Sequence, residues 1–566
     1  MSVELLPSPP HITGPTWQRT VDGGWHLPER SLGWEIFNWW AKYVRTPGGR
    51  NAGSPFLPTD EQARFTLWWY AVDDEGNYVY REGCLRRMKG WGKDPLAAAL
   101  SLAELCGPVA FSHFDGNGQP VGKPRFAAWV QIAAVSQDQT KNTFRLFPTM
   151  VSEALRTEFG LDINKFVIYA RDGGLLEAVT SSPASMEGNR PTFVIRNETQ
   201  WWGCGPDGAI NEGHAMAEVI TGNLGKTEGA RQLSICNAHI PGHGTDTEVT
   251  EAEKDYDTWQ DIAAGESVDT GVLYDALEAP ADTPLSEIPP EREDPEGYAD
   301  GIERLKAGLR VAIGDAYWLS IDWILGTVLS AKNRVSESRR KFLNQVNAYE
   351  DSWLAPWQWD RAIKLGAKLE PGERITLGFD GSKSTDWTAL VACRVSDGCL
   401  FPLAVWNPEK CPGGEIPRQD VDAVVRSCFE TYNTVAFRAD VKEFEAYVDA
   451  WGALYRRKVK VNASPNNPVA FDMRGQRKRF ALDCERFEAA VNDGEICHDG
   501  NRVLRQHVLN ARRHPTPYDA ITIRKISKDS KRKIDMAVCG VLAYGARQDY
   551  LMSKHNRPTG GTVIIR

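Results

Sequence analysis

The sequence predicts an α/β protein with two separate sheet-containing regions, and three observations lead to this prediction. Apolar runs alternate with helical patterns twice, from about residue 79 to 240 and again from 375 to about 547. A glycine-rich turn with a lysine lies between a strand and a helix of the first region, at 86–95. Three widely spaced aspartates, Asp380, Asp440 and Asp535, lie at the ends of expected elements in the second region.

Composition narrows the functional classes. The chain has 566 residues, of which 42% are hydrophobic and 25% charged, as in folded multidomain proteins. Its longest apolar stretch, 316–329, contains Ser320 and Asp322 and is shorter than the ~20 residues that a membrane-spanning helix needs. The N-terminus has no basic and apolar leader, and the eleven cysteines include no CxxC pair. We therefore expect a cytoplasmic protein without a membrane segment, a disulfide framework or a zinc knuckle.

The first region is expected to alternate buried strands with helices, as in a parallel sheet. The expected strands are 78–85, 129–134, 192–195 and 233–236, and the expected helices are 95–106, 139–159 and 209–223. The first 60 residues are rich in Pro, Gly and Trp and predict an irregular arm packed on this region.

An acidic, proline-rich linker separates the two regions. Helices are then expected over 298–312, 317–329 and 336–348. The second region is expected to form strands at 375–380, 388–395, 399–406, 434–440 and 520–525, with helices over 441–455, 471–491 and 534–545.

The net charge of −9 is unevenly distributed. Residues 246–300 contain eighteen Asp and Glu against two Lys and Arg, whereas residues 502–533 contain ten Lys and Arg against two Asp. A basic segment of this kind is either a solvated surface or a binding site for nucleic-acid phosphates.

The sequence RRMKGWGKDP at 86–95 has the strand, turn and helix order of a P-loop. The backbone N–H groups around Gly90 and Gly92 and the helix N-terminus are expected to face phosphates, while Lys93 reaches the β/γ oxygens. Arg87 stands where the first glycine is usual, and Asp94 replaces the Ser or Thr that touches Mg²⁺. Because Asp94 before a proline also suits an ordinary helix start, a simple cap remains the alternative to nucleotide binding.

Asn197 and Glu198 follow the buried strand at 192–195. P-loop enzymes carry a metal-binding Asp and a catalytic carboxylate at this place, and here the metal-binding position is an Asn. Glu198 is a candidate general base for the attacking water, and a polar strand end is the alternative.

Asp380 and Asp440 end strands, and Asp535 opens a helix after the basic run 525–533. Such carboxylates can converge at one sheet edge and hold two divalent ions about 4 Å apart, which activate water and stabilise the leaving oxygen of a phosphodiester. Each one alone also suits a turn or a helix cap, and Asp386 and Asp529 are second choices as ligands. Seven neighbouring cations are expected to neutralise the DNA backbone without reading its sequence, namely Arg512, Arg513, Lys525, Lys528, Lys531, Arg532 and Lys533.

The order of these motifs resembles the large terminase subunit of tailed bacteriophages, in particular its actinobacteriophage-like branch, over roughly residues 55–547. The series comprises LPTDEQARF, RRMKGWGKDPLAAA, AAVSQDQTKNTFRLF, VTSSPASMEGNRPTFVIRNE, LSICNAH and the three aspartates. The resemblance implies an α/β fold with a P-loop NTPase parallel-sheet domain followed by an RNase H-like nuclease domain. It implies that Gln62 contacts adenine and that Lys93 binds the phosphates. It also implies that Glu198 is the ATPase base, and that Ser234 and Asn237 couple hydrolysis to DNA grip.

The function implied by this resemblance is ATP-driven translocation of double-stranded viral DNA into a procapsid, with endonucleolytic cleavage of concatemeric DNA. The implied cofactors are ATP with Mg²⁺ for the ATPase and two Mg²⁺ or Mn²⁺ ions for the nuclease. The implied partners are the DNA, a small terminase subunit and a portal protein, in a homo-oligomeric ring docked on the procapsid in the host cytoplasm. An arginine acting in trans is also expected, with Arg86, Arg87 and Arg145 as candidates.

Five segments are expected, with boundaries at 1–55 (N-terminal arm), 56–245 (P-loop ATPase domain), 246–372 (acidic linker and helical subdomain), 373–548 (RNase H-like nuclease domain) and 549–566 (tail). Asp94 is expected to compensate for Asn197, with the carboxylate moved from the strand end to the P-loop. Two alternatives remain open: a metal-dependent nuclease on a degenerate, non-hydrolysing ATPase-like scaffold, and a helicase-nuclease of repair or defence. The sequence has no recognisable second motor domain of the helicase type between residues 240 and 375, which argues against the helicase-nuclease.

Overall fold

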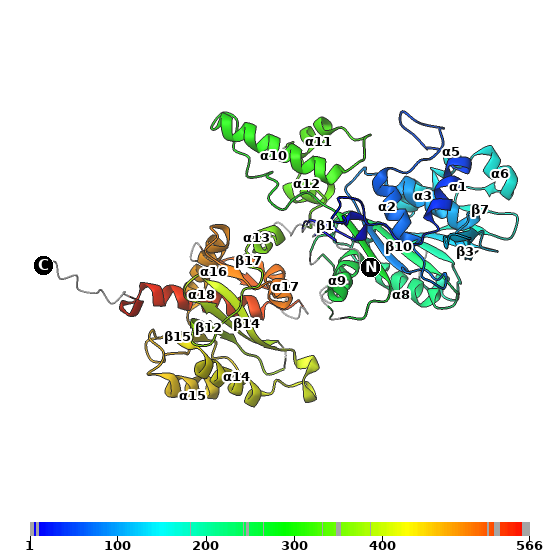
Figure 1. Ribbon diagram of the computed structural model, residues 1–566. Coiled ribbons are helices and arrows are strands. Elements are labelled where there is room, and N and C mark those ends of the chain that lie inside the picture. The colour runs from blue at the N-terminus through cyan, green and yellow to red at the C-terminus, as the bar shows by residue number, and fades with distance from the viewer. Residues whose placement is uncertain are drawn as a thin grey trace. The chain divides into compact units, whose positions relative to one another are not determined.

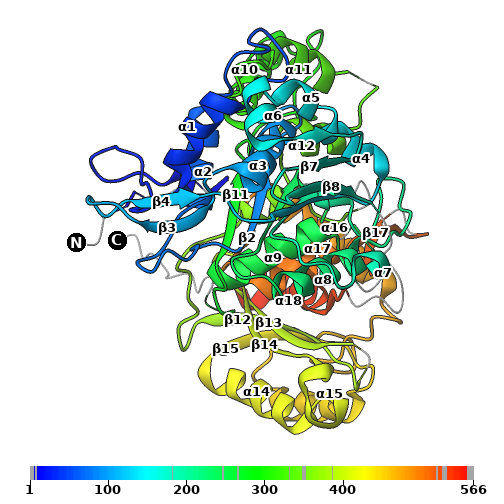
Figure 2. The same ribbon diagram turned by 90° about the vertical axis from the view of Figure 1, so that its right-hand side faces the viewer.

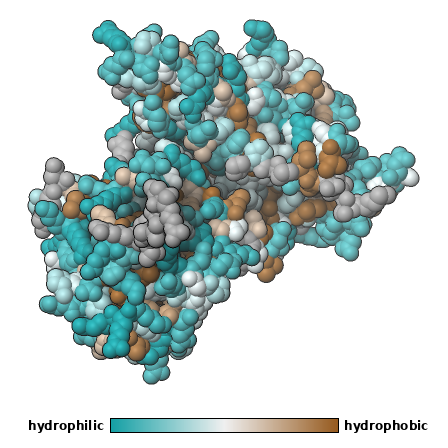
Figure 3. Space-filling model, turned by 60° about the vertical axis from the view of Figure 1, so that its left-hand side comes forward, coloured by the Kyte–Doolittle hydropathy of each residue, from teal (hydrophilic) through white to brown (hydrophobic). Residues whose placement is uncertain are grey.

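The computed structural model describes residues 5–6, 9, 11–180, 183–241, 243–244, 248–263, 265, 267–330, 332–346, 352–384, 386–517, 520–525 and 532–556. The chain divides into two units, residues 1–347 and 348–566, and each is described by itself (Figure 1). On the face drawn in Figure 3, hydrophilic side chains predominate and apolar ones form small patches. Within the described ranges, no helix has both the length and the apolar character needed to cross a bilayer.

The first unit is built on a nine-stranded sheet with the order β1-β11-β2-β10-β9-β5-β8-β7-β6. These strands are β1 (Ile12–Thr13), β2 (Glu82–Arg86), β5 (Trp129–Ala133), β6 (Asp162–Ile163), β7 (Val167–Tyr169), β8 (Leu175–Val179), β9 (Phe193–Asn197), β10 (Arg231–Cys236) and β11 (Val272–Leu277). The strands from β11 to β8 in this order run parallel, so the carboxyl ends of β2, β9 and β10 meet at one edge. The sequence predicted a parallel sheet for this region, and this sheet is parallel over most of its strands.

Helices cover both faces of this sheet. α1 (Gly33–Tyr43), α2 (Asp60–Trp69) and α3 (Lys93–Cys106) bury their apolar sides in one core with Leu85, Ile195 and Leu233. α8 (Gly213–Leu224) and α9 (Glu251–Ala263) cover the other face. The remaining elements are the hairpin β3 (Ala110–Phe114) and β4 (Pro120–Lys123), the short α7 (Pro183–Met186), and α10 (Pro295–Ile313), α11 (Ile321–Val328) and α12 (Val335–Phe342).

Several expectations for the first unit were wrong. The single helix expected at 139–159 is three helices, α4 (Gln137–Phe144), α5 (Phe147–Met150) and α6 (Glu153–Phe159), because a proline opens α5 and Ser152 caps α6. The strand expected at 78–85 begins only at Glu82, and α1 lies within the arm expected to be irregular. Strand β11, which lies in the acidic stretch, was not predicted.

The second unit has a five-stranded sheet with the order β15-β12-β13-β14-β16. These strands are β12 (Arg374–Asp380), β13 (Thr388–Arg394), β14 (Cys399–Trp406), β15 (Asn433–Ala439) and β16 (Cys497–His498). β12, β13 and β14 are antiparallel neighbours, and β15 runs parallel to β12. The second sheet-containing region that the sequence predicted is thus a mixed sheet.

α16 (Arg477–Asn492), α17 (Arg502–Asn510) and α18 (Asp535–Met552) share a core on one face of this sheet. α14 (Arg418–Thr431) and α15 (Glu445–Tyr455) cover the other face (Figures 1 and 2). α13 (Pro356–Asp360) and the hairpin β17 (Arg512–Pro515) and β18 (Ile521–Arg524) complete the unit. The helix expected at 471–491 begins only at Arg477, because Phe471 is extended and its N–H donates to the Ala439 carbonyl (2.8 Å).

Candidate functional site

The loop between β2 and α3 has the backbone of a phosphate cradle. Gly90 and Gly92 adopt φ values of +89° and +102°, which side-chain-bearing residues rarely adopt. A Cβ atom on Gly92 would also lie 2.9 Å from the Trp318 ring and 3.3 Å from Gln62 Nε2, so the site requires glycine. Because the first N–H groups of α3 have no partner within the helix, its N-terminus is suited to an anion.

Lys93 lies inside this loop. Its buried Nζ donates hydrogen bonds to the carbonyl oxygens of Arg87 (2.9 Å) and Met88 (3.0 Å). Asn237, just beyond β10, donates from Nδ2 to the same Arg87 carbonyl (2.8 Å). Burial lowers the pKa of Lys93, against the opposing effect of the Glu198 and Asp94 carboxylates. The cation is therefore close to both acids on which the predicted ATPase chemistry depends.

Glu198 has a strained backbone and a fixed side chain. Its φ of +58° is unusual for a residue other than glycine, and such strain is common at active sites. Gln200 donates from Nε2 to Glu198 Oε2 (2.5 Å), and Gln200 Oε1 accepts the Asn237 N–H (3.3 Å). A hydrogen-bonded chain thus joins the candidate base to the end of β10. Gln200 was not predicted from the sequence.

Asp94 and Asn197 are joined by a residue that the sequence analysis also missed. Thr143 in α4 donates from Oγ1 to Asp94 Oδ1 (3.2 Å) and accepts from Asn197 Nδ2 (3.4 Å). Asn197 Oδ1 is buried and has no hydrogen-bond partner among the described residues. Carboxylate, hydroxyl and amide oxygens are ligands that Mg²⁺ accepts. The three side chains therefore fit the metal of a nucleotide.

Two other predicted nucleotide contacts are used within the protein. Arg87 is fully buried, forms an ion pair with Asp275 of β11 and donates from Nη1 to the Asp275 carbonyl (3.1 Å). Gln62 Oε1 accepts the Thr59 N–H (3.1 Å) at the start of α2, while its Nε2 faces Gly92. Gln62 therefore lies beside the loop, whereas the Arg87 guanidinium is bonded to Asp275 of β11 and so ties the loop to the sheet.

The remaining predicted residues of this unit lie apart from the chain formed by Glu198, Gln200 and Asn237. The Ser234 hydroxyl hydrogen-bonds Asp255 of α9 and helps to lower the pKa of that carboxyl, although burial raises it overall. Arg86 pairs with Glu278 (3.2 Å). Arg145 forms the C-cap of α4.

In the second unit, the two strand-end aspartates are neighbours. Phe379 of β12 pairs with Ala439 of β15, so Asp380 and Asp440 follow directly from paired residues. The Asp440 N–H donates to the Phe379 carbonyl (2.9 Å). Asp535 begins α18, the helix packed across β12 and β13.

The charges of Asp535 and Asp440 act on the buried carboxyl of Asp380. Burial, followed by the charges of Asp535 and Asp440, raises the pKa of Asp380 well above its usual range. Burial raises the pKa of Asp535 to about 6, with a further contribution from the charge of Asp386. Burial also raises the pKa of Asp440. Buried carboxylates that oppose one another's ionisation are stabilised by divalent cations.

The donor atoms of this cluster also fit metal binding. Asp535 Oδ2 is buried with no hydrogen-bond partner among the described residues, and Asp440 Oδ1 is oriented by the Met473 N–H (3.2 Å). The three side chains do not form a group with ligand atoms all within 4.8 Å of one another, the distance for sharing a single ion. Two ions about 4 Å apart do not require that closeness.

One compact group of possible ligands lies elsewhere in the second unit. Asp397, Cys399 and Cys497 have donor atoms within 4.8 Å of one another. Asp397 already pairs with Arg394 (2.9 Å) and Lys364 (2.9 Å), and these hydrogen bonds lower its pKa against the effect of burial. Two cations at the only carboxylate make this group a poor cation site.

The predicted DNA-binding cations have varied surroundings. Arg512 is buried against Ser352, and Arg513 pairs with Glu488. Lys525 (2.5 Å) and Lys533 (2.9 Å) both pair with Asp386. Arg532 is described, whereas Lys528, Lys531 and the second-choice ligand Asp529 lie outside the described residues.

Comparisons with known proteins identify close relatives. The Gene 13 protein of Mycobacterium phage L5 is 66% identical, with 100% of this chain and 99% of that protein covered. The Gene 13 protein of Mycobacterium phage D29 is 65% identical, with the same coverage. No protein-family model matches the chain.

The solved structures similar to this chain include those of phage large terminases. The HK97 bacteriophage large terminase is 17% identical, covers 91% of this chain and 100% of its own, and gives a TM-score of 0.43. The large terminase of a thermophilic bacteriophage, in complex with ADP, is 10% identical over 87% of this chain and 98% of its own, with a TM-score of 0.30. The nuclease of the phage G20c large terminase with bound magnesium is 14% identical over 35% of this chain and 97% of its own, with a TM-score of 0.27.

Proposed function

This chain belongs to the family of the mycobacteriophage Gene 13 proteins, and we propose that it is a terminase large subunit, an ATP-driven DNA translocase joined to a metal-dependent endonuclease. The observation that carries the proposal is the placement of the buried Asp380 carboxyl beside Asp440 at paired strand ends, with the charges of Asp535 and Asp440 raising its pKa. The same chain has a glycine-rich phosphate cradle around Lys93 at the edge of another sheet. A motor and a nuclease that act on one DNA substrate have reason to share a chain.

In the first unit, the backbone N–H groups at the start of α3 and the Lys93 ammonium bind the phosphates of ATP. The side chains of Asp94, Thr143 and Asn197 hold Mg²⁺, which neutralises charge on the phosphates when bound. Glu198 accepts the proton of the water that attacks the γ-phosphate. Gln200 and Asn237 then connect the position of Glu198 to the loop that contacts the phosphates.

In the second unit, Asp380, Asp440 and Asp535 hold two Mg²⁺ or Mn²⁺ ions. When bound, these ions activate water and stabilise the leaving oxygen of the phosphodiester. The chain's own part is to hold the three carboxylates beside the ions and to orient Asp440 through the Met473 N–H.

The partners follow from the same proposal. Double-stranded viral DNA is the substrate of both units, a small terminase subunit delivers it, and the portal protein of a procapsid receives the motor as a homo-oligomeric ring. Packaging of this kind takes place in the host cytoplasm.

Two substitutions test the two activities separately. Lys93→Ala is expected to lower ATP turnover about 100-fold, because a cation that stabilises the transferred phosphoryl group is lost. Lys89→Ala is the matched control, since Lys89 is exposed in the same loop. Equal ATP turnover in Lys93→Ala and the wild type would instead support the non-hydrolysing scaffold.

Asp380→Asn is expected to abolish Mn²⁺-dependent cleavage of plasmid DNA without lowering ATP turnover. Asp420→Asn, an exposed position in the first turn of α14, is the control for loss of one acidic side chain. Undiminished cleavage by Asp380→Asn would refute the nuclease assignment.

A further inference from the structure

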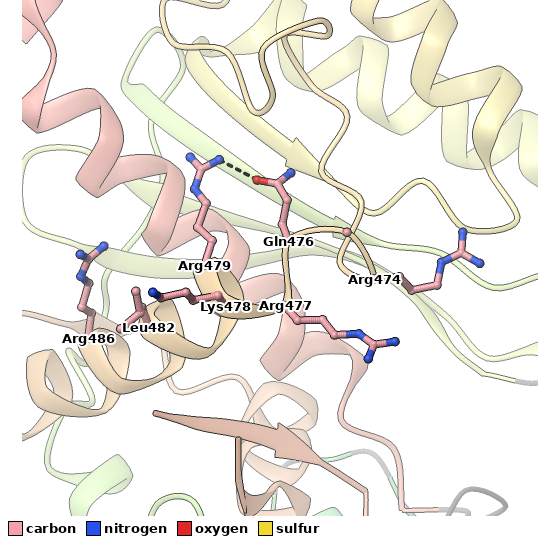
Figure 4. A pocket seen from close by; sticks show the side chains of 8 residues that line it. Arg474, Gln476, Arg477, Lys478, Arg479, Leu482 and Arg486 are labelled. Carbon is pink, nitrogen blue, oxygen red and sulfur yellow. Dashed lines mark hydrogen bonds between the residues drawn. The ribbon is translucent and has the colours of Figure 1, made fainter. Parts of the chain in front are cut away.

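A cluster of cations lines an open groove in the second unit, at the start of α16. The groove has a volume of about 450 Å³ and is lined by Arg474, Gly475, Gln476, Arg477, Lys478, Arg479, Leu482 and Arg486 (Figure 4). We call its cations Arg474, Arg477, Lys478 and Arg486 the α16 basic surface. Residues 474–486 do not overlap the basic run predicted to bind DNA.

Two of these cations have no acidic partner. Arg477 and Lys478 are exposed and make no ion pair with a described residue. Arg474 and Arg486 are exposed as well, and each has one long contact with an acid of its own segment, Asp472 (3.5 Å) and Asp483 (3.6 Å) respectively. Like-charged side chains without local neutralisation attract a polyanion from solution.

The fifth cation, Arg479, anchors the surface. It donates to Asp549 of α18 (2.5 Å) and to the Ala463 carbonyl (2.8 Å). Arg438 of β15 donates to the same Asp549 (2.6 Å) and to Asp483 of α16 (2.6 Å). The network holds the first turns of α16 against the sheet, so the outward-pointing cations stand on a rigid support (Figure 4).

The α16 basic surface begins next to a residue that contacts the carboxylate cluster. Met473, which precedes Arg474, donates its backbone N–H to Asp440 Oδ1 (3.2 Å). One residue therefore separates a side chain that holds metal in the proposed nuclease from a side chain that attracts phosphate.

Four of the cations predicted from the sequence are bonded within the protein. Lys525 and Lys533 are 16% and 15% exposed and share Asp386, while Arg513 pairs with Glu488. Arg512 is 5% exposed. Arg513 is 44% exposed but paired with an acid, whereas Arg477 and Lys478 of the α16 basic surface are exposed and form no ion pair with a described residue.

We propose that the α16 basic surface binds the sugar-phosphate backbone of the double-stranded DNA that the second unit cleaves, and guides the scissile phosphate to Asp440. The proposal rests on the proposed endonuclease function. Arginine and lysine side chains contact phosphates without reading bases, so this binding is independent of DNA sequence and strongly dependent on salt.

The test measures binding apart from cleavage. The full chain carrying Asp380→Asn, which leaves the DNA intact, is titrated into a fluorescent duplex of about 30 base pairs at several salt concentrations. Adding Arg477→Ala with Lys478→Ala is expected to weaken binding about tenfold or more at low salt. It is also expected to reduce the slope of log K against log salt by about 2, because two phosphate contacts are lost.

The matched control replaces Arg456 and Arg457, two exposed arginines at the end of α15 on the opposite face of the sheet. Arg456→Ala with Arg457→Ala removes the same charge and is expected to leave the affinity and the slope unchanged. An unchanged thermal unfolding midpoint of the Arg477→Ala, Lys478→Ala protein confirms that its fold is intact. Arg477→Lys, which keeps the positive charge, is expected to bind the duplex almost as tightly as the Asp380→Asn protein without it.

The outcomes separate the surface from the nuclease. If the α16 variant and the α15 control bind DNA equally well, the proposed surface is refuted while the nuclease assignment stands. If Asp380→Asn still cleaves DNA, the proposed nuclease function fails, whatever the affinities are.

Discussion

Substitution of Asp275 tests whether Arg87 supports the phosphate loop or contacts the nucleotide. The side chains of Arg87 and Asp275 are both 0% exposed and form an ion pair. Asp275 also accepts hydrogen bonds from Thr16 and Trp17, the latter at 3.3 Å. Asp275→Leu therefore leaves a buried guanidinium without its counter-charge and removes the two hydrogen bonds that Thr16 and Trp17 donate to the carboxylate.

The cost can be worked out from these contacts. An orphaned buried charge costs about 3–5 kcal/mol, and each hydrogen bond to the carboxylate contributes at least about 1.5 kcal/mol. The free energy of unfolding of the first unit should fall by roughly 6–8 kcal/mol or more, a large share of the about 5–15 kcal/mol typical of folded proteins. At about 2 °C per kcal/mol, the first thermal transition should fall by about 10 °C or more.

The double variant Arg87→Met with Asp275→Leu removes both charges. It should lose only about 3 kcal/mol, because the two hydrogen bonds to the carboxylate are then the main loss, so its melting temperature should recover by about half or more. Since the guanidinium of Arg87 is bonded to Asp275 and to backbone carbonyls, the double variant should also keep its affinity for ADP. Calorimetry and ADP titration measure both quantities. The reasoning is refuted if the double variant melts no higher than the single one, or if it folds but no longer binds ADP.

Three further predictions concern the two sites. Asp94→Thr should abolish ATP turnover, and adding Asn197→Asp should restore it, because the exchange returns the carboxylate to the strand end; a dead double variant would contradict the compensation. Gln200→Ala should lower kcat for ATP about tenfold with KM almost unchanged, since a charge-assisted hydrogen bond worth about 1.5–3 kcal/mol no longer orients Glu198; a change confined to KM would argue against this role. Burial raises the pKa of Asp535 from 3.8 to about 6, so the folded metal-free chain binds more protons than the unfolded chain between these values. Its free energy of unfolding should then fall by up to about 3 kcal/mol as the pH rises from about 4 to about 6, and Asp535→Asn should flatten that dependence in urea titrations with a chelator.

The sequence predicted the central strands of both units because buried strands are continuous apolar runs. Residues 129–134, 233–236 and 375–380 were expected to be strands and correspond to β5, β10 and β12. The same patterns placed Asp380 at a strand end and Asp535 at a helix start, as the structure has them. Local pattern was sufficient because these elements are buried along most of their length.

Strand β11 could not be predicted from its local composition. Its sequence, VLYDAL, lies in a stretch dominated by acids, and Asp275 in its centre is unusual for a buried strand. It is a strand because it pairs in parallel with β2, and its aspartate is tolerated because Arg87 neutralises it. Both partners are distant in the sequence, so no window around residue 275 contains the cause.

Thr143 and Gln200 were missed for a related reason. Each is an ordinary polar residue in its segment, and neither has a motif spacing that marks it. Their roles come from tertiary contacts across the carboxyl edge of the sheet, to Asp94 and Asn197 in one case and to Glu198 in the other. Sequence spacing alone reveals the side chains that act on a ligand more readily than it reveals the residues that orient those side chains.

The departures from the usual P-loop pattern have a common physical explanation. Arg87 replaces a glycine and is neutralised by Asp275. Asp94 provides a carboxylate where a hydroxyl is usual, and Asn197 provides an amide where a carboxylate is usual. Both side chains are hydrogen-bonded to Thr143. In each case a polar group that would be costly to bury has acquired a partner elsewhere in the fold. A chain that had merely lost nucleotide binding would have no need to retain Lys93 buried and bonded to loop carbonyls, with two acids beside it. These contacts therefore support our proposal that the altered residues form a rebuilt nucleotide site rather than a decayed one.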